Sequence, residues 1–338
     1  MIDLLIAGGG PIGLAAAIEA RMAGLAVAVV EPRPAPIDKA CGEGLMPGAV
    51  TALARLGVDP PGRTLTGISY LDGSRRVDHG FRHGAGRGVR RTTLHAALEA
   101  RARVLGVERV VGKVDAYEQS ADSVVAAGIE ARWLLGCDGL HSRVRELAGL
   151  AARPRGPRRF GLRRHFAVAP WNDLVEVHWT GKAEVYVTPI GDLEVGVAVL
   201  GPQHTDYEAA LDALPSLAAR LDGAAVTTST RGAGPLRQRT RARTAGRVLL
   251  VGDASGYVDA ITGEGIRVGL AQARAAVECI LAGKPKRYER EWRRVTRDFR
   301  MLTAGLVVLG ASPLRPAIVP LACALPAFYG RAVERLAR

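Results

Sequence analysis

The residue types best suited to chemistry gather in one segment, GDASGYVDAITGEGI, from Gly252 to Ile266. Four glycines, two aspartates and a glutamate crowd into it, between the apolar run VLLV and a helical pattern. Glycine costs backbone entropy, so this density indicates that the main chain passes close to a ligand. A helix that begins here would turn its free N–H groups and positive dipole end toward negative charge. The segment therefore indicates a ligand that the main chain approaches closely.

A second glycine-rich turn lies at the N-terminus. An apolar run over residues 2–7 leads into Gly8-x-Gly10-x-x-Gly13 and an alanine-rich helix, and the next apolar run ends on Glu31. Gly8 makes the tight turn, Gly10 lets the backbone approach a pyrophosphate, and Gly13 lets the helix pack on the strand. Glu31 follows Gly13 by eighteen residues, where a carboxylate can bind an adenosine ribose. This βαβ pattern predicts a dinucleotide site, whereas a plain structural turn leaves Glu31 unexplained.

Two more segments complete a set of four motifs. VRRTTLHAAL predicts a helix that begins at Arg91, and WLLGCDGLHSRVRE places Asp138 directly after a strand. The order GxGxxG, R-x-x-L-x-x-x-L, D-G-x-x-S-x-x-R and G-D resembles the flavoprotein monooxygenase superfamily, the group with the para-hydroxybenzoate hydroxylase fold. The resemblance runs from the N-terminus to about Ala282, and it implies that the dinucleotide is FAD.

The same resemblance assigns roles to single residues. Asp253 would hold a ribityl hydroxyl of the flavin, and the helix that Gly263 opens would face the pyrimidine edge. Arg91 would contact the FAD, and Asp138 would lie near its phosphates. The implied cofactor-binding set is Gly8, Gly10, Pro11, Ile12, Gly13, Glu31, Pro32, Arg33, Cys41, Gly42, Arg91, Val114, Asp138, Gly139, Gly252, Asp253, Gly263, Glu264, Gly265 and Ile266.

The resemblance implies an α/β fold: a Rossmann-like FAD-binding domain of the glutathione-reductase type, an inserted antiparallel β-sheet substrate domain, and C-terminal helices. Four alternating runs follow Phe160, and Asp72-Gly73 is a hairpin signal. A helix is expected over about 206–221. The expected ranges are 1–60, 85–155 and 240–285 for the FAD domain, 61–84 and 156–239 for the sheet domain, and 286–338 for the helices. The expected substrate-facing walls are Phe166, Val168, Val175, Val177, Val187 and Val197.

Composition narrows the class of partner. The chain has 338 residues, is 48% apolar and carries a formal net charge of +13. No basic helix is interleaved with aromatic residues, so we expect no nucleic-acid partner. The excess charge suits anionic ligands instead. A local basic patch is either a solvated edge or a guide for an NADPH phosphate or anionic substrate. It comprises the arginines at 153, 155, 158, 159, 163 and 164.

Cysteine spacing and hydropathy bear on the compartment. The four cysteines lie far apart without a CxxC pair, which argues against a metal site or disulfide framework and favours a reducing cytoplasm. The chain begins directly with a strand pattern, so we expect no signal peptide. Prolines interrupt the C-terminal apolar stretches before they reach the ~20 residues that span a bilayer. We expect at most a weak peripheral membrane contact through the C-terminal helices; the oligomeric state stays open.

The reaction type is less clear than the cofactor. The segment KACGEGLMPGA, which contains Cys41, resembles the Cys-Gly-x-Gly stretch of the geranylgeranyl-reductase-like branch, as do Ser255-Gly256 and the GEG turn. That branch also has a tyrosine–tryptophan–phenylalanine–proline signature, whereas Tyr186-Val187-Thr188-Pro189 stands here. The branch's proline before GEG and its longer C-terminal region are missing too. The W-x-W-x-I-P stretch of flavin-dependent halogenases is absent, which argues against a halogenase.

Three functions stay open at this point. The favoured one is an NAD(P)H-dependent monooxygenase that acts through a flavin C4a-hydroperoxide on a hydrophobic aromatic, polyketide or isoprenoid-type molecule. The alternative is reduction of an isoprenoid carbon–carbon double bond, with Cys41 as a candidate proton donor or a lining residue. The third is a flavin-binding protein without turnover. The missing aromatic signature favours the oxygenase. His165 would either orient a polar substrate group or serve the structure.

Overall fold

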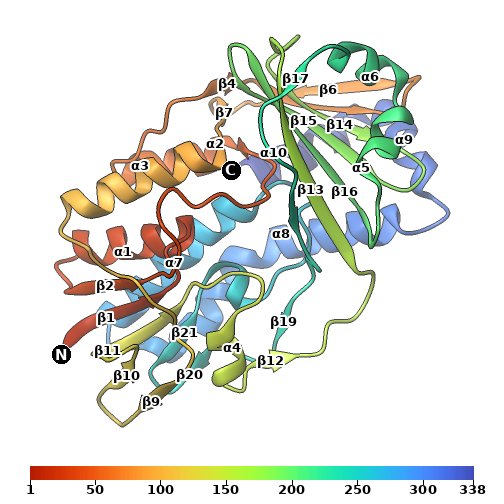
Figure 1. Cartoon of the computed structure of the whole chain (residues 1–338). Coiled ribbons are helices and arrows are strands. Elements are labelled where there is room, and N and C mark those ends of the chain that lie inside the picture. Colours follow the sequence, from red (N-terminus) through yellow and green to blue (C-terminus); the bar gives the residue numbers. More distant parts are fainter.

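The computed structural model describes residues 1–338 and has two lobes that share the C-terminal helices (Figure 1). The first lobe, which we call the Rossmann-like lobe, contains the N-terminal strand and the helices around it. The second, the sheet lobe, contains the long antiparallel strands drawn in green in Figure 1. This arrangement confirms the expected α/β fold class.

A mixed sheet forms the centre of the Rossmann-like lobe, in the order β20-β21-β11-β1-β2-β8. Strand β1 lies between two parallel neighbours, β2 and β11. Such strands are buried on both faces, and accordingly the last four residues of β1 and all four of β2 are buried. The strands are β1 (Ile2–Ala7), β2 (Val27–Val30), β8 (Glu108–Val110), β9 (Tyr117–Gln119), β10 (Val124–Ala126), β11 (Ile129–Gly136), β20 (Thr244–Ala245) and β21 (Val248–Leu250).

Helices α1 (Pro11–Met22) and α7 (Gly265–Leu281) pack together against one face of this sheet. Alanines of both helices, among them Ala16, Ala20 and Ala276, belong to one core cluster, and Ile12 of α1 lies against Gly269 of α7. Small side chains let the two helices approach closely. Helix α3 (Arg91–Val104) packs on the other side of α1. The glycine-rich turn and the start of α7 consequently lie at the same end of the sheet (Figure 1).

The sheet lobe has the strand order β17-β13-β16-β15-β14-β5-β6. Strands β13 to β16 pair antiparallel, as expected, and β5 and β6 form the hairpin that the Asp-Gly signal predicts. Strand β5, however, lies parallel to β14, so the sheet is not purely antiparallel. The strands are β5 (Gly67–Leu71), β6 (Arg76–Gly80), β13 (Arg159–Ala167), β14 (Leu174–Trp179), β15 (Glu184–Gly191), β16 (Glu194–Pro202), β17 (Ala225–Val226) and β18 (Arg231–Ala233).

The outer face of this sheet is covered by α5 (Tyr207–Asp212) and α6 (Pro215–Leu221). The sequence pattern predicts one helix here, but the structure has two, because the first helix ends before Pro215. The proline ring cannot continue a helix, and Pro215 is instead the first residue of α6. Four of the expected substrate-facing walls are wrong, because they pack into the core under these two helices: Phe166, Val168, Val187 and Val197.

The C-terminal helices connect the lobes. Helix α8 (Tyr288–Gly310) packs Trp292 into the core of the Rossmann-like lobe and Val307 into the core beside the sheet lobe. Helices α9 (Ile318–Ala324) and α10 (Pro326–Ala337) then pack against the β5–β6 hairpin. No single helix is long and apolar enough to cross a bilayer; the pair formed by 285–310 and 315–324, bent by 117°, satisfies the length and composition criteria only jointly.

The domain ranges expected from the sequence stay a prediction. Short elements complete the chain. The short elements are β3 (Gly44–Leu45), α2 (Pro47–Arg55), β4 (Arg63–Leu65), β7 (Gly86–Gly88), α4 (Arg143–Leu147), β12 (Ala151–Ala152), β19 (Arg239–Thr240) and the 3₁₀ turns η1 (Gly252–Ser255), η2 (Pro285–Arg287) and η3 (Arg315–Ala317).

Candidate active site

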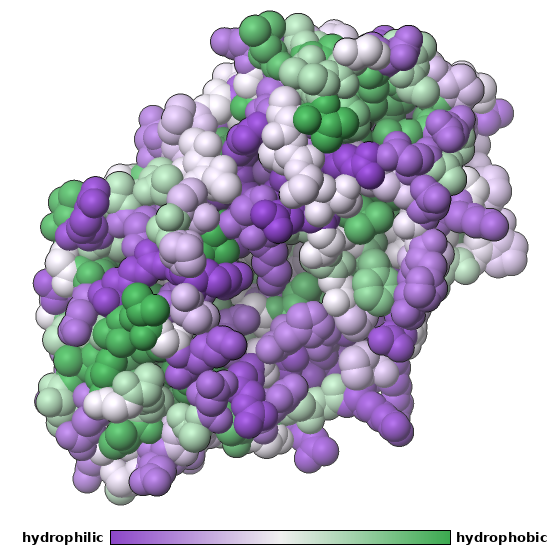
Figure 2. Space-filling model, viewed as in Figure 1, coloured by the Kyte–Doolittle hydropathy of each residue, from purple (hydrophilic) through white to green (hydrophobic).

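A cavity of about 250 Å³ lies between the two lobes and reaches from the glycine-rich turn to the inner face of the sheet lobe. Figure 2 shows hydrophilic residues gathered around the hollow between the lobes. One end of the cavity is polar and is lined by the Rossmann-like lobe. The other end is apolar and is lined by the sheet and by α10. The two ends therefore suit a polar ligand lying next to an apolar one.

The glycine-rich turn forms the polar end. Gly8 has a φ of +104°, which favours glycine, and a Cβ at Gly13 would lie 1.9 Å from the Gly8 carbonyl oxygen. Helix α1 starts at Pro11 without a side-chain cap, so its first N–H groups stay free at the cavity. Because free helix N–H groups attract anions, the turn has the geometry of a phosphate cradle.

Glu31 lies behind this turn and is 1% exposed. It accepts hydrogen bonds from the Gly9 N–H at 2.9 Å and from the Arg33 Nε at 2.7 Å. Burial alone would raise the pKa of Glu31, but these two donors outweigh it and hold the pKa below its ordinary value. The carboxylate is therefore ionised. Gly9 and Arg33 together donate four hydrogen bonds to its two oxygens, so a ribose hydroxyl would have to replace one of these donors.

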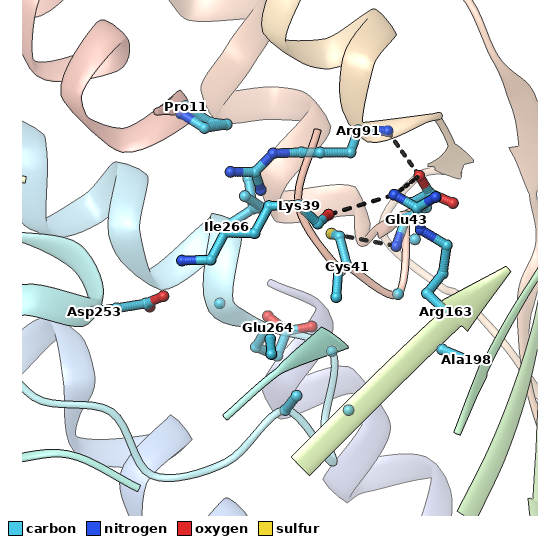
Figure 3. Close-up of a pocket in the computed structure, with 18 of the residues that line it drawn as sticks. Pro11, Lys39, Cys41, Glu43, Arg91, Arg163, Ala198, Asp253, Glu264 and Ile266 are labelled. Carbon is cyan, nitrogen blue, oxygen red and sulfur yellow. Dashed lines mark hydrogen bonds and ion pairs between the residues drawn. The ribbon is translucent and has the colours of Figure 1, made fainter. Parts of the chain in front are cut away.

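Cationic side chains surround the polar end, and sequence reasoning missed one of them. The Lys39 ammonium lines the cavity without a hydrogen-bond partner, and Figure 3 shows it pointing toward Asp253. Burial lowers the pKa of Lys39, while Asp253 opposes this shift and Arg91 adds to it. The Nε atom of Arg91 is buried without a partner. Lys39 stands two residues before Cys41, but no motif spacing identifies a single lysine there.

The two predicted aspartates have unsatisfied oxygens at this end. Asp138 accepts a hydrogen bond from the Val144 N–H at 3.0 Å through Oδ2, whereas its Oδ1 is buried without a partner. The Asp253 carboxylate accepts no hydrogen bond within the chain, and burial raises its pKa against the opposing charges of Lys39 and Arg91. Buried polar atoms normally have partners, so Asp138 Oδ1 indicates a ligand with hydroxyl groups, and the partly buried Asp253 carboxylate lines the same cavity.

A loop from the Rossmann-like lobe carries Cys41 into the cavity. Its Sγ accepts a long hydrogen bond, 3.4 Å, from the Glu43 N–H. The buried Glu43 carboxylate holds the loop in place. It accepts a hydrogen bond from the Arg91 N–H at 2.8 Å (Figure 3), and it pairs with the His165 Nε2 at 2.5 Å. His165 is 2% exposed and does not line the cavity, so it is a structural residue.

Glu264 is a buried acidic group in the lining of the cavity. It stands at the N-cap position of α7, lines the cavity and is 2% exposed. Its Oε2 pairs with Arg267, whereas its Oε1 is buried without a partner. Burial raises the pKa of Glu264 to about 7, although Arg267 opposes the shift. This carboxyl can therefore gain or lose a proton near neutral pH.

The apolar end has walls from three parts of the fold. Of the walls expected from the sequence, Val175 and Val177 lie here. Tyr186 also lies here, and its hydroxyl donates a hydrogen bond to the Ile261 carbonyl at 2.7 Å. The other apolar lining residues include Ile68, Tyr70, Leu162, Ala198, Leu200, Leu236, Val333 and Leu336.

Most of the residues expected to bind the cofactor line the cavity together: Gly8, Gly10, Pro11, Ile12, Arg33, Cys41, Gly42, Arg91, Asp138, Gly139, Gly252, Asp253, Gly263, Glu264, Gly265 and Ile266. Four lie outside its lining. Gly13 packs against Gly8, Glu31 lies behind Gly9, Pro32 is exposed, and Val114 is buried in the core on the far face of the sheet. The individual roles stay predictions.

The basic patch expected near residue 160 is divided among ion pairs. Arg159 pairs with Glu184, Arg163 with Asp38, and Arg164 with Glu208. Arg90, the neighbour of Arg91, pairs with Glu194. Of the six arginines in the patch, only those at 153, 155 and 158 face solvent without a partner.

Comparison with known proteins identifies the ligand. The family described as FAD binding domain matches residues 89–283, more than half of the chain. The chain belongs to this FAD-binding family. This flavoprotein is 28% identical to a menaquinone reductase from Mycolicibacterium smegmatis, over 86% of the chain and 79% of the reductase.

A monooxygenase is also similar. The 12-dehydrotetracycline 5-monooxygenase/anhydrotetracycline 6-monooxygenase of Streptomyces rimosus is 31% identical over 47% of the flavoprotein, and the match spans 35% of that enzyme. In structure, the flavoprotein superposes on OxyS anhydrotetracycline hydroxylase from Streptomyces rimosus with a TM-score of 0.70 and 24% identity, over 99% of this chain and 76% of the other. The flavoprotein is an FAD-dependent oxidoreductase of the flavoprotein monooxygenase superfamily, as the four motifs predict.

The polar end of the cavity fits FAD. The free N–H groups of α1, the Lys39 ammonium and the Arg91 guanidinium, whose Nε is buried without a partner, suit a pyrophosphate. The Asp253 carboxylate, which lines the cavity, suits a ribityl hydroxyl. Bound FAD would supply the redox chemistry next to the apolar end of the cavity.

Replacing Asp253 by alanine is expected to weaken FAD binding by roughly 10- to 100-fold, because a hydrogen bond to a charged acceptor is worth about 1.5–3 kcal/mol. Quenching of flavin fluorescence during titration of the apoprotein measures the dissociation constant. Asp115, which is exposed and makes no hydrogen bond, provides the control substitution. If the Asp253 variant binds FAD as tightly as the parent, Asp253 is only a turn residue.

The raised pKa of Glu264 predicts a pH-dependent stability. The ordinary pKa of Glu264 is 4.5, and in the folded chain it is about 7. Between these two pH values the folded chain keeps a proton that the unfolded chain has lost. The contribution of this group to the free energy of unfolding therefore falls as the pH rises through that window, by about 3 kcal/mol. Urea unfolding of the apoprotein should show that Glu264→Gln removes this loss and is more stable than the parent above pH 7. The exposed Glu118→Gln should leave the pH profile unchanged; equal profiles for the parent and Glu264→Gln contradict the assignment.

Proposed function

We propose that this flavoprotein is an NAD(P)H-dependent monooxygenase that acts on a hydrophobic aromatic, polyketide or isoprenoid-type molecule. The observation that carries the proposal is the continuity of the cavity, whose polar end fits FAD and whose other end is apolar. A substrate held there would lie against the cofactor with little water around it. Exclusion of water is what an oxygenation needs from its protein, since the cofactor supplies the chemistry.

The chain's own residues have three tasks in this proposal. Lys39, Arg91 and Asp253 bind and orient the cofactor. The apolar walls, including Val175 and Leu200, exclude water and orient the substrate. Glu264, whose Oε1 has no partner, holds or moves a proton at the boundary between the two ends. The similar tetracycline monooxygenase supports the proposal, and the S. rimosus hydroxylase shows that the fold accommodates a polycyclic substrate.

A second candidate is reduction of a carbon–carbon double bond in an isoprenoid-type molecule. The position of Cys41 in the cavity and the similarity to a menaquinone reductase favour it. In that case Cys41 or Glu264 would deliver the proton that accompanies hydride transfer. The two candidates differ in whether the product contains oxygen from O₂.

The test uses the FAD-loaded protein with NADPH or NADH, ¹⁸O₂, and two substrate pools: polycyclic phenols and isoprenoid naphthoquinones. An oxygenase yields a product that carries one ¹⁸O atom, consumes oxygen and gives no product in its absence. A reductase yields a product heavier by two hydrogens, with and without oxygen. Reduction of the flavin by NAD(P)H with only this second product would overturn the proposal.

Cys41→Ser separates the two chemistries at one residue. For an oxygenase, the serine should change the rate of product formation less than about threefold, and release of hydrogen peroxide should be the main symptom. For a reductase that uses this thiol, product formation should fall by roughly 10²-fold while flavin reduction survives, because that is the usual scale for loss of a general acid. Single-turnover measurements with and without oxygen distinguish these outcomes; we expect the first.

A further inference from the structure

The apolar stretch near the C-terminus has an unusual charge pattern. From Met301 to Phe328 the chain carries one charged side chain, Arg315. That charge is largely shielded, because Arg315 donates to the carbonyls of Thr180 at 2.7 Å and Ala183 at 2.6 Å and pairs with Glu184, and its side chain is 10% exposed. The whole stretch therefore presents little charge to solvent.

The same stretch exposes large apolar side chains. It contains six of the fourteen large hydrophobic residues that the chain leaves exposed. All five residues from Ala324 to Phe328, which run from the last residue of α9 into the first turn of α10, are exposed and apolar. Figure 1 shows the end of α8, the following loop and α9 at one edge of the molecule, and α10 packs against both helices. We call this surface the apolar edge: Met301, Val308, Leu314, Leu321, Leu325 and Phe328.

Arginine-rich segments flank the apolar edge on both sides in the sequence. Residues 290–300 contain five arginines and two acids, and residues 331–338 contain three arginines and one acid. Among them, Arg293 and Arg331 are exposed and form no ion pair. An uncharged apolar surface bordered by cations is the pattern of proteins that bind anionic lipid surfaces, where apolar side chains enter the acyl boundary and basic ones meet the headgroups.

The apolar edge lies next to the active-site cavity. Val333 and Leu336 on the inner side of α10 line the cavity, whereas Phe328 and Arg331 on its outer side are exposed. One helix thus separates the cavity from the apolar edge. A lipid-soluble molecule would have a short route from a membrane into the apolar end of the cavity.

We propose that the apolar edge docks this flavoprotein on the surface of an anionic lipid bilayer. A second copy of the chain fits less well, because a two-fold interface sets the same surface against itself and would bring the flanking arginines together. An anionic headgroup layer instead complements them and the net charge of +13. The proposal holds whether the enzyme oxygenates or reduces its substrate.

The test is flotation of the full-length, FAD-loaded protein with vesicles. It should bind vesicles of equimolar phosphatidylglycerol and phosphatidylcholine, and bind pure phosphatidylcholine much more weakly, with the difference reduced by salt. Leu325→Asp with Phe328→Asp should lower the partition coefficient about tenfold or more, since both apolar side chains lose their burial in the bilayer. Arg331→Glu should weaken binding to the anionic vesicles.

Leu193→Asp provides the matched control, because Leu193 is 74% exposed but lies in the turn between β15 and β16. It should bind like the parent, and an unchanged flavin spectrum shows that each variant is folded. The proposal is wrong if the parent does not bind anionic vesicles, or if the double variant binds as well as Leu193→Asp. It is equally wrong if the parent elutes as a dimer that the double variant converts to a monomer, without lipid binding.

Discussion

Replacing Gly13 by alanine is expected to lower the affinity for FAD by roughly 100-fold, the largest single effect on the cofactor site. The new Cβ would lie 1.9 Å from the carbonyl oxygen of Gly8, and neither backbone segment can move without opening the turn. Steric overpacking costs up to about 3 kcal/mol, which corresponds to this loss of affinity. The turn that opens is the one whose N–H groups face the cavity, so the cost falls on binding. Flavin fluorescence titration of the apoprotein measures it.

Gly305 offers the matched control, since it is also a helical glycine but has nothing within 4 Å of its added Cβ. Gly305→Ala should keep the parent affinity for FAD and gain slightly in stability, because alanine favours helix. If both variants bind FAD like the parent, the contact of α1 with the turn is not what holds the cofactor.

The largest effect on stability is expected for Arg163→Leu. Arg163 is 1% exposed and reaches from the sheet lobe to the loop of the Rossmann-like lobe. Its guanidinium bonds Asp38 at 2.5 Å and lies 3.8 Å from the buried Glu43 carboxylate. Leucine would leave the buried Glu43 carboxylate without this cation, and Asp38 would keep only its pair with Arg231. The loss of one partner from a buried pair costs about 3–5 kcal/mol. Urea unfolding of the apoprotein should show this decrease, and FAD binding should weaken because the same loop carries Lys39.

Arg164→Leu is the control for this prediction, because it removes the same charge from a neighbouring position in the strand. Arg164 pairs with Glu208, whose side chain is 62% exposed, and a surface pair contributes at most about 1 kcal/mol. Arg164→Leu should therefore unfold nearly like the parent and keep the parent affinity for FAD. Equal losses in the two variants would mean that Arg163 acts through the charge of the lobe and not through its buried contacts.

Local spacing made the cofactor end of the site predictable. Glycines and acids occur at recognisable spacings in two places, the glycine-rich turn with Glu31 and the run from Gly252 to Ile266. Both places can therefore be found from the sequence. The walls of the apolar end were predicted poorly. Alternation along β15 shows that Val187 and Tyr186 face opposite sides of the sheet, but not which side carries helices. Val187 faces α5 and α6, and Tyr186 lines the cavity.

Long-range contacts explain the other omissions. Lys39 enters the site because Asp38 and Glu43 are held by Arg163 and His165, more than 120 residues away in the sequence. No local pattern contains that information. Similarly, the Asp-Gly turn predicts the β5–β6 hairpin but not that β5 lies parallel to β14, about 100 residues further along the chain.

The discontinuity of the cofactor site has a consequence for synthesis of the chain on the ribosome. The cavity takes residues from the first turn at Gly8 and from the start of α7 at Ile266, so most of the chain must emerge before the site is complete. At about 5–20 residues per second, that interval lasts on the order of 10–50 s. During this interval β1 lacks first its neighbour β11 and then β21, the strand next to β11, because both are synthesised later. We therefore expect FAD to bind late in folding. It would then stabilise a chain that is nearly complete, and it would not guide the folding of the N-terminal half.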